Sequence, residues 1–334
     1  MTFDSLDREI LATIDLVPRT GSKAIAERVG RSPQVIEYRL KSLEKRGIVG
    51  GFYPIVDAFK LGFRYCRLFV KLADFTPKVV RSITTFVRKT PSVLWCYRMH
   101  GDHNIVVVFW TRSLREFDAL SLQFLTLPGL QSVTFNQNQV FQLDQYHVSR
   151  ALKGNIRDKV TIQETEETAS VDSLDQLILS SLGGNARQPY SRIAHSCGTS
   201  DKVVAYRIQR MEESGILCGF RPIINWSALG RFFFKILLQL DSSRAGLREK
   251  VLNYVTTTPE LLYVIHGVGN PGDIDIEIVV PTYEALFEYV EKVRTRFPSA
   301  VRSFSHYHFT DCYKVNYFPL NQQNRAGKRG KTYP

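Results

Sequence analysis

The sequence lacks the long apolar runs and the regular cysteine patterns that mark several classes of protein. No apolar run reaches the roughly 18 residues that a membrane-spanning helix needs. The residues after Met1 carry neither the basic nor the apolar segment of a secretory signal. The five cysteines are scattered, odd in number and without metal-type pairing. We therefore expect a cytoplasmic chain with no structural disulfide and no association with a membrane.

Motifs of catalysis and cofactor binding are also missing from the sequence. We find no glycine loop that would cradle a phosphate and no Gly-x-Ser-x-Gly elbow, and no paired catalytic carboxylates stand out. His306 and His308 would share one face of a strand, but no cysteine or helical pair completes a ligand set. We therefore predict no catalytic residue, no metal site and no cofactor.

One long stretch of the sequence occurs twice. Residues 6–62 match residues 174–230 without a gap, at a constant offset of 168 positions. The matched pairs include Ser32 and Ser200, Tyr38 and Tyr206, Arg39 and Arg207, Gly47 and Gly215, and Phe52 and Phe220. Such a match identifies an internal duplication before any fold is assumed.

Each copy begins with the pattern of a winged helix-turn-helix. In the first copy, Ser32 and Pro33 provide a helix N-cap and a proline at the first helical position. Ile36, Leu40 and Leu43 follow at helical spacing and predict one buried stripe. A glycine then ends the helix, and residues 48–52 read as the strand and turn of a wing.

The pattern changes after each of these units. Alternating apolar strands and two amphipathic helices follow in the order βαββαβ, which predicts a ferredoxin-like sandwich of α+β class. Residues between the copies are acidic and without periodicity, as in a linker, and the C-terminus is basic and polar, as in a disordered tail. The predicted boundaries are 1–62 and 173–230 for the helix-turn-helix units, 63–147 and 231–320 for the ferredoxin-like units, 148–172 for the linker and 321–334 for the tail.

The third helix of each unit exposes side chains that suit base edges and phosphates. The N-terminal part of such a helix is what a helix-turn-helix presents to the major groove. Gln, Glu, Arg and Val can each recognise a base or a methyl group there. The predicted DNA-binding residues are Ser32, Gln34, Val35, Glu37, Tyr38, Arg39 and Lys41 in the first copy, and Ser200, Lys202, Val203, Tyr206 and Arg207 in the second. Because the two faces differ, we expect two unlike half-sites.

These motifs together resemble a known family. The run from Ile25 to Pro33, the run from Arg39 to Ile48 and the following Gly51-Phe52 are similar to those of the Lrp/AsnC (feast/famine) transcriptional regulators. The βαββαβ unit resembles the RAM domain of that family. The resemblance implies double-stranded DNA as a partner, an amino acid or another small effector, and homo-oligomers that form through the RAM domains. A tandem copy departs from the single unit of ordinary members and implies a pseudo-dimer within one chain.

The resemblance also points to an effector site. The loop His100, Gly101, Asp102, His103 and Asn104 matches the family's Gly-Asp turn, where relatives hold an effector. Glycine allows close approach of the backbone, and a carboxylate can receive an α-amino group. In the second copy the loop is longer, and Gly267 and Asp273 are the corresponding residues. A simple hairpin turn rich in Gly, Asn and Asp is the alternative.

Two other functions remain open at this point. Siroheme decarboxylases resemble the same fold and pair two such units, and the stretch Tyr97 to His100 is similar to one of their motifs. A protein-interaction or architectural scaffold is the second alternative. The net charge of +12 suits a polyanionic partner. However, residues 6–62 supply only +3 of it and residues 174–230 only +2, so charge alone does not identify nucleic acid.

Overall fold

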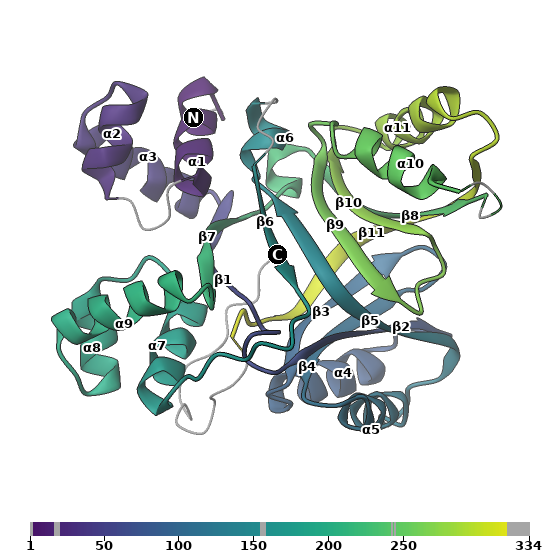
Figure 1. The fold of residues 1–334 in the computed structure, drawn as a ribbon, viewed down its shortest axis with the longest axis horizontal. Helices are drawn as coiled ribbons and strands as arrows, with labels where there is room; N and C mark the ends of the chain where they lie inside the picture. Colours follow the sequence, from purple (N-terminus) through teal and green to yellow (C-terminus); the bar gives the residue numbers. More distant parts are fainter. Residues whose placement is uncertain (1–2, 17–20, 154–157, 242, 244, 319–334) are drawn as a thin grey trace.

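The computed structural model describes residues 3–16, 21–153, 158–241, 243 and 245–318. The basic tail predicted at 321–334 lies outside these residues. Two three-helix heads lie on the same side of the molecule (Figure 1). The first head contains α1 (Ser5–Leu16), α2 (Ser22–Val29) and α3 (Pro33–Lys45). The second contains α7 (Ser173–Gly184), α8 (Tyr190–Cys197) and α9 (Asp201–Glu213).

The strand after each head pairs with its counterpart from the other copy. Strand β1 (Val49–Val56) runs antiparallel to β7 (Leu217–Ile224), and the two form a separate two-stranded sheet. The strand predicted at residues 48–52 as part of a wing therefore pairs with the other copy and not within its own winged unit. The β1–β7 ribbon therefore connects both heads to each other.

Each copy then forms the predicted ferredoxin-like unit. The first contains β2 (Arg64–Leu72), α4 (Pro77–Lys89), β3 (Val93–His100), β4 (Ile105–Thr111), α5 (Leu114–Leu125) and β5 (Ser132–Tyr146). The second contains β8 (Phe232–Leu240), α10 (Leu247–Val255), β9 (Leu261–Val268), β10 (Ile274–Val280), α11 (Tyr283–Arg296) and β11 (Val301–Val315). The strand orders are β5-β2-β4-β3 and β11-β8-β10-β9, which confirms the α+β class.

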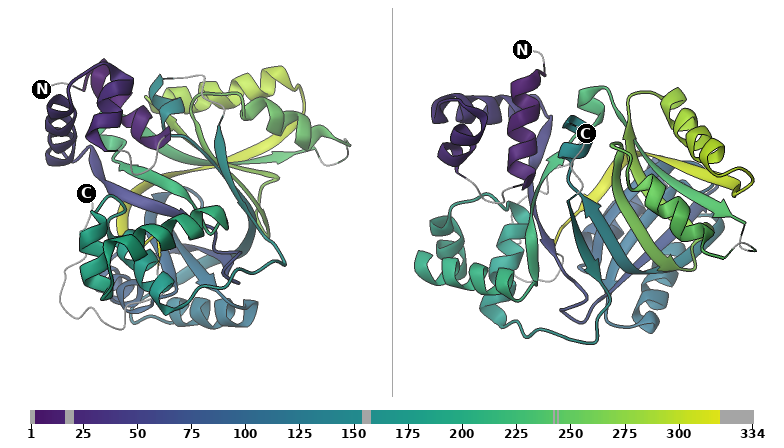
Figure 2. Two further views of the ribbon diagram at one scale, coloured as in Figure 1. Left: turned by 60° about the vertical axis from the view of Figure 1, so that its left-hand side comes forward. Right: turned by 45° about the horizontal axis from the view of Figure 1, so that its top comes forward.

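The two four-stranded sheets close into one barrel. Strand β3 of the first copy pairs with β11 of the second, and β5 of the first pairs with β9 of the second. Every barrel edge is therefore paired with the other copy, so neither sheet presents an edge for aggregation. Helices α4 and α5 cover one outer face and α10 and α11 the other (Figures 1 and 2).

Apolar side chains fill both the outer and the inner faces of the barrel. The outer faces pack against the helices, as with Ile83 of α4 in the first unit and Val290 of α11 in the second, both buried. The inner face belongs to a larger core that continues into both heads and the ribbon. The heads are thus packed on the end of the barrel that the ribbon covers.

Part of the predicted linker is ordered. Residues 149–153 form the short helix α6 (Ser149–Lys153), and β6 (Lys159–Gln163) adds to the sheet beside β5. Val148 and Ile162 are buried, although both lie within the segment 148–172 that was predicted to be a linker. A 3-10 turn, η1 (Ser227–Leu229), precedes β8. Within the described residues, no helix combines the length and the apolar character needed to cross a bilayer.

Candidate nucleic-acid interface and effector site

Helices α3 and α9 are built in the same way. Each follows a glycine in the left-handed conformation, Gly30 with φ 65° and Gly198 with φ 66°, which turns the chain sharply out of the preceding helix. The Ser32 hydroxyl accepts a hydrogen bond from the amide of Val35, and Ser200 caps α9 in the same manner. The predicted stripe of Ile36, Leu40 and Leu43 is buried. These contacts fix which side chains each helix presents outward.

The N-terminal parts of both helices are exposed. Tyr38 is 61% exposed and Tyr206 63%, and Val35 and Val203 are each 36% exposed. In both copies these four exposed side chains occupy equivalent positions at the N-terminal part of the third helix. The remaining exposed residues of the predicted set are Ser32, Gln34, Glu37, Lys41, Ser200 and Lys202.

Arg39 and Arg207 differ from the rest of the predicted set because both are engaged within their heads. Arg39 Nη1 lies 2.8 Å from Asp4 Oδ2 and 3.3 Å from Asp7 Oδ1. Hydrogen bonding to Asp4 raises the pKa of this guanidinium. Arg207 contacts Asp172 and Asp175 in the same way. These arginines hold the third helix against the first, so they have a structural role that the sequence did not reveal.

A buried ion pair joins the first head to the ribbon, and both of its partners bond backbone groups at or just after the end of barrel strand β5. Arg221 of β7 donates through Nε to Asp15 Oδ1 of α1 at 3.2 Å, and through Nη2 to the carbonyl of Tyr146. Asp15 also accepts from Val148 N at 2.5 Å. At the repeat offset of 168 the counterparts of Asp15 and Arg221 are Gly183 and Tyr53, so the second head has no equivalent pair. There, Gly183 lies directly against Phe318.

The two predicted effector loops lie at the two junctions between the copies. In the first loop, Asp102 accepts a hydrogen bond from Ser305 Oγ at 2.6 Å, and His103 Nδ1 lies 3.2 Å from the Tyr307 hydroxyl. The Asn104 side chain accepts a hydrogen bond from the amide of Leu72 and donates one to its carbonyl oxygen. A side chain at Gly101 would lie 2.5 Å from the carbonyl oxygen of His306. His100 is exposed and faces His308 across the strand pair.

At the second loop the glycine makes the equivalent contact at the opposite junction, whereas the aspartate bonds within its own copy. A side chain at Gly267 would lie 2.5 Å from the carbonyl oxygen of Gln139 in β5. The Asp273 carboxylate accepts from the amide of Leu240 at 2.6 Å. The two loops therefore do not converge on one pocket. Their glycines allow β3 and β9 to approach the other copy closely, which is a structural reason for glycine at both positions.

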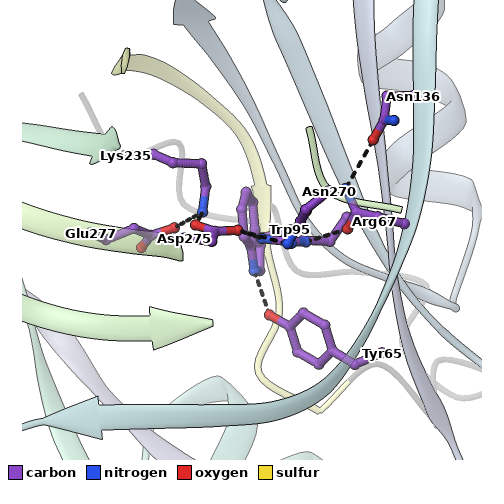
Figure 3. A network of polar contacts seen from close by, with 9 residues as sticks. Tyr65, Arg67, Trp95, Asn136, Lys235, Asn270, Asp275 and Glu277 are labelled. Carbon is purple, nitrogen blue, oxygen red and sulfur yellow. Dashed lines mark hydrogen bonds and ion pairs between the residues drawn. The ribbon is translucent and has the colours of Figure 1, made fainter. Parts of the chain in front are cut away.

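A network of buried charges lies inside the barrel (Figure 3). Asp275 accepts from Lys235 Nζ at 2.6 Å and from Arg67 Nη1 at 2.8 Å. Glu277 lies 3.0 Å from the same lysine. Asn138 and Asn270 accept the other Arg67 hydrogen bonds, at 2.6 and 2.8 Å. Two cations thus balance two anions, as buried charges require.

Sequence reasoning missed this network, although a signal was present. Arg67 and Lys235 stand at the same position of the two copies, at the 168-residue offset, in the middle of apolar strands. A cation inside an apolar strand pattern is rare unless it is paired. The two carboxylates do not recur in this way. Val106 and Val108 pair with β2 in the first copy, whereas Asp275 and Glu277 take the equivalent positions beside β8 in the second copy.

A large cleft separates the heads and the ribbon from part of the barrel. It has a volume of about 1760 Å³ and is lined by α3, α7, both ribbon strands and β11. Glu37 and Lys41, two of the predicted DNA-binding residues, line it as well. Burial lowers the pKa of Lys314 in its wall to about 8. Among the described residues, no group of three or more His, Cys, Asp or Glu side chains gathers to hold a metal ion.

Comparison with known proteins agrees with this geometry. A model for winged helix-turn-helix DNA-binding domains matches residues 3–49, a model for the Lrp/AsnC ligand-binding domain matches residues 66–136, and a model for AsnC-type helix-turn-helix domains matches residues 171–212. The regulatory protein AsnC of Haemophilus influenzae is 34% identical over 120 residues, which cover 35% of this chain and 77% of that protein. This chain belongs to the Lrp/AsnC family of transcriptional regulators.

Other relatives extend the family likeness. The HTH-type transcriptional regulator Ptr1 of Methanocaldococcus jannaschii is 32% identical over 110 residues, covering 33% of this chain and 72% of that protein. The crystal structure of the siroheme decarboxylase NirDL matches 94% of this chain and 94% of its own, with a TM-score of 0.59 and 13% identity. That second likeness shows a shared fold only. The Lrp/AsnC match together with the second helix-turn-helix supports the tandem arrangement that the sequence predicted.

Proposed function

We propose that this Lrp/AsnC family member binds a specific double-stranded DNA sequence through both heads at once and so regulates transcription. The observation that carries the proposal is the pair of equivalent third helices, each with an exposed tyrosine and valine at its N-terminal end, on one chain. The closed barrel and the ribbon connect these helices within one chain and would set the distance between them. A dimer of this kind reads two half-sites about one DNA turn apart, roughly 34–36 Å.

We assign base reading to the exposed residues of the two helices. One half-site would be read by Gln34, Val35, Glu37 and Tyr38, and the other by Lys202, Val203 and Tyr206. The phosphate backbone of the DNA would lie near Ser32, Lys41 and Ser200. Arg39 and Arg207 then act as positioning residues, because their guanidiniums already bind two carboxylates each. The unlike residues Gln34 and Lys202 at one repeat position favour unlike half-sites.

Single replacements in the two heads should therefore affect different halves of the target. We expect Tyr38→Ala and Tyr206→Ala each to weaken binding by about 1–3 kcal/mol, or roughly 5–150-fold, if each ring contacts a base. Tyr38→Ala should abolish protection of one half-site in footprinting, and Tyr206→Ala protection of the other. The target would come from selection among genomic duplexes at several salt concentrations.

Two further variants make this test specific. Gln209→Ala removes an exposed side chain from the C-terminal half of α9, where its amide bonds Glu213 at 2.8 Å, and should leave the footprint unchanged. Arg39→Ala should lower the thermal stability of the first head, since buried Asp7 loses a partner. If neither tyrosine variant changes a footprint at a duplex that the parent binds, the assignment of the reading face is wrong.

We also propose that a small molecule modulates the DNA-binding activity. The support is the family's ligand-binding domain together with the position of both effector loops at the junctions between the copies. An amino acid bound near Asp102 or Asp273 would alter these junctions and with them the relation of the heads. Association of several chains through the ferredoxin-like units would be a second route to the same change.

A tetrapyrrole enzyme is the second candidate function. It is favoured by the full-length likeness in fold to a siroheme decarboxylase and by the cleft of about 1760 Å³ beside Lys314 and His308. Titration of the purified protein with iron-uroporphyrin, followed by absorption spectroscopy, tests it. A saturable spectral shift that Lys314→Met abolishes would support this candidate. Specific DNA binding without any such shift would exclude it.

A further inference from the structure

A second, smaller cavity lies in the lumen of the barrel, next to the cleft described above, with which it shares wall residues such as Tyr97, Phe233 and Phe309. Its volume is about 170 Å³, and each of the eight barrel strands contributes at least one lining residue. Protein cores are normally packed without voids much larger than a water molecule. An apolar cavity of about 150 Å³ in another protein binds benzene. The lumen is thus large enough for one substituted ring.

Aromatic and aliphatic side chains both contribute to the walls of this cavity, and the aromatic rings come from both copies. Tyr65, Trp95 and Trp110 come from the first copy, and Phe233 and Tyr263 from the second. Aromatic rings pack against one another edge to face or with an offset, and such contacts favour a planar ligand over a saturated one. Rings from both copies surround the space, so a flat ring would contact both halves of the barrel.

Two hydrogen-bond donors belong to these walls. Trp110 is 3% exposed, and its Nε1 has no hydrogen-bond partner among the described residues. A buried donor without an acceptor is costly, so its presence needs an explanation. The Tyr65 hydroxyl accepts from Trp95 Nε1 at 3.1 Å. Burial raises the pKa of Tyr65, so the phenol keeps its proton at neutral pH and can donate it.

The charges at the cavity wall cancel. Arg67 and Glu277 line the cavity, and both belong to the balanced network around Asp275 and Lys235 (Figure 3). An anionic or cationic ligand would leave one buried charge uncompensated. A neutral molecule avoids that cost. The polar groups of the cavity wall therefore favour a neutral ligand that forms hydrogen bonds over a charged one.

We propose that the barrel lumen is a binding site for a small, uncharged, single-ring aromatic molecule that carries a hydrogen-bond acceptor. Its ring would lie among the aromatic walls, and its acceptor would receive the Trp110 indole proton. This site is distinct from the junction loops, where we placed the family-type effector.

The site is also placed to influence the heads. Tyr53, Pro54, Ile55 and Val56 of β1 form part of the cavity wall. Strand β1 belongs to the ribbon that joins both heads, and Pro54 pairs with Phe220 of β7. A ligand in the lumen would contact the ribbon directly and favour one position of it. This effect on DNA binding rests on the proposed function, whereas binding of the ligand does not.

Calorimetric titration of the full chain with four matched probes tests the proposal. Acetophenone has the planar ring and the acceptor, ethylbenzene lacks the acceptor, cyclohexyl methyl ketone lacks the planar ring, and benzoate is charged. We expect acetophenone to bind at least tenfold more tightly than each of the other three. Equal affinity for all four, or no binding of acetophenone at millimolar concentration, would overturn the proposal.

Two variants connect binding to the cavity. Trp110→Phe keeps a ring but removes the indole donor, so it should reduce the affinity for acetophenone to that for ethylbenzene and leave ethylbenzene unchanged. Val140→Phe should fill the lumen and abolish binding of both. Unchanged acetophenone affinity in a folded Trp110→Phe variant would exclude the indole as the donor and overturn the assignment. Because no DNA is present, failure of the proposed function would leave these results intact.

Discussion

Replacing Asp275 with asparagine is expected to destabilise the protein by about 3–5 kcal/mol, the usual cost of breaking a buried ion pair. Asp275 is 2% exposed and binds both Lys235 and Arg67. Its neutralisation leaves two buried cations facing only Glu277. Denaturant unfolding followed by tryptophan fluorescence would measure the change.

A double-mutant cycle separates charge balance from shape in this network. Lys235→Met alone leaves two carboxylates facing Arg67, whereas the double variant Lys235→Met, Asp275→Asn restores one charge of each sign. The double variant should therefore cost less than the sum of the single variants, by about 1–3 kcal/mol.

An exposed ion pair provides the control for this cycle. Glu291→Gln breaks the pair with Arg294 at 2.9 Å on the surface of α11 and should change stability by less than about 1 kcal/mol. Additive costs in the cycle, or a loss for Glu291→Gln as large as that for Asp275→Asn, would contradict a coupled buried network.

Replacing Arg221 with methionine should release the first head from the barrel. The side chain is 2% exposed, and without it the Asp15 carboxylate keeps only His147 and the Val148 amide. We expect a loss of about 3–5 kcal/mol. Hydrogen exchange should rise in α1 and not in α7, because the second head has Gly183 at the position of Asp15.

The same variant should change the response to acid. Burial opposes ionisation of Asp15, but the charge of Arg221 and the hydrogen bonds from His147 and Val148 lower its pKa below the ordinary 3.8. A carboxyl whose pKa is lowered by folding stabilises the fold at pH values above its pKa in the unfolded state. This contribution is lost as the pH falls below about 3.8. Without Arg221 the pKa should rise, so unfolding in acid should begin at a higher pH.

An exposed arginine again serves as the control. Arg302→Met removes an exposed pair with Asp241 and should leave both the exchange of α1 and the acid transition unchanged. Equal exchange increases in α1 and α7 of the Arg221→Met variant would show that the ion pair does not hold the first head specifically.

The local structure was predictable because it depends on neighbouring residues. The stripe of Ile36, Leu40 and Leu43, the Ser32 cap and the βαββαβ order follow from spacing within a few turns or strands, and all are confirmed. Closure of the barrel was not predictable in this way. Periodicity identifies a strand and its buried face, but it does not identify which strand pairs with the edge of β3.

The contacts around the candidate site could not be predicted from the sequence. Exposure of Tyr38 and Tyr206 agrees with the predicted face, but the ion pairs of Arg39 and Arg207 depend on carboxylates 32 and 35 positions earlier in the chain. The Asp15–Arg221 pair spans 206 positions. No local sequence pattern indicates such contacts. The sequence therefore does not distinguish an arginine that forms an ion pair from one that is free to bind DNA.

Fusion of the two halves has a genetic consequence. In a dimer of identical chains every substitution appears twice, so a change that suits one head must also suit the other. Here both barrel junctions lie within a single chain, and each substitution appears once. The register pairs Arg67 with Val108 in one copy and Lys235 with Glu277 in the other, so the halves have already diverged. If the heads bind DNA as proposed, a substitution can adapt one head to its own half-site without altering the other head.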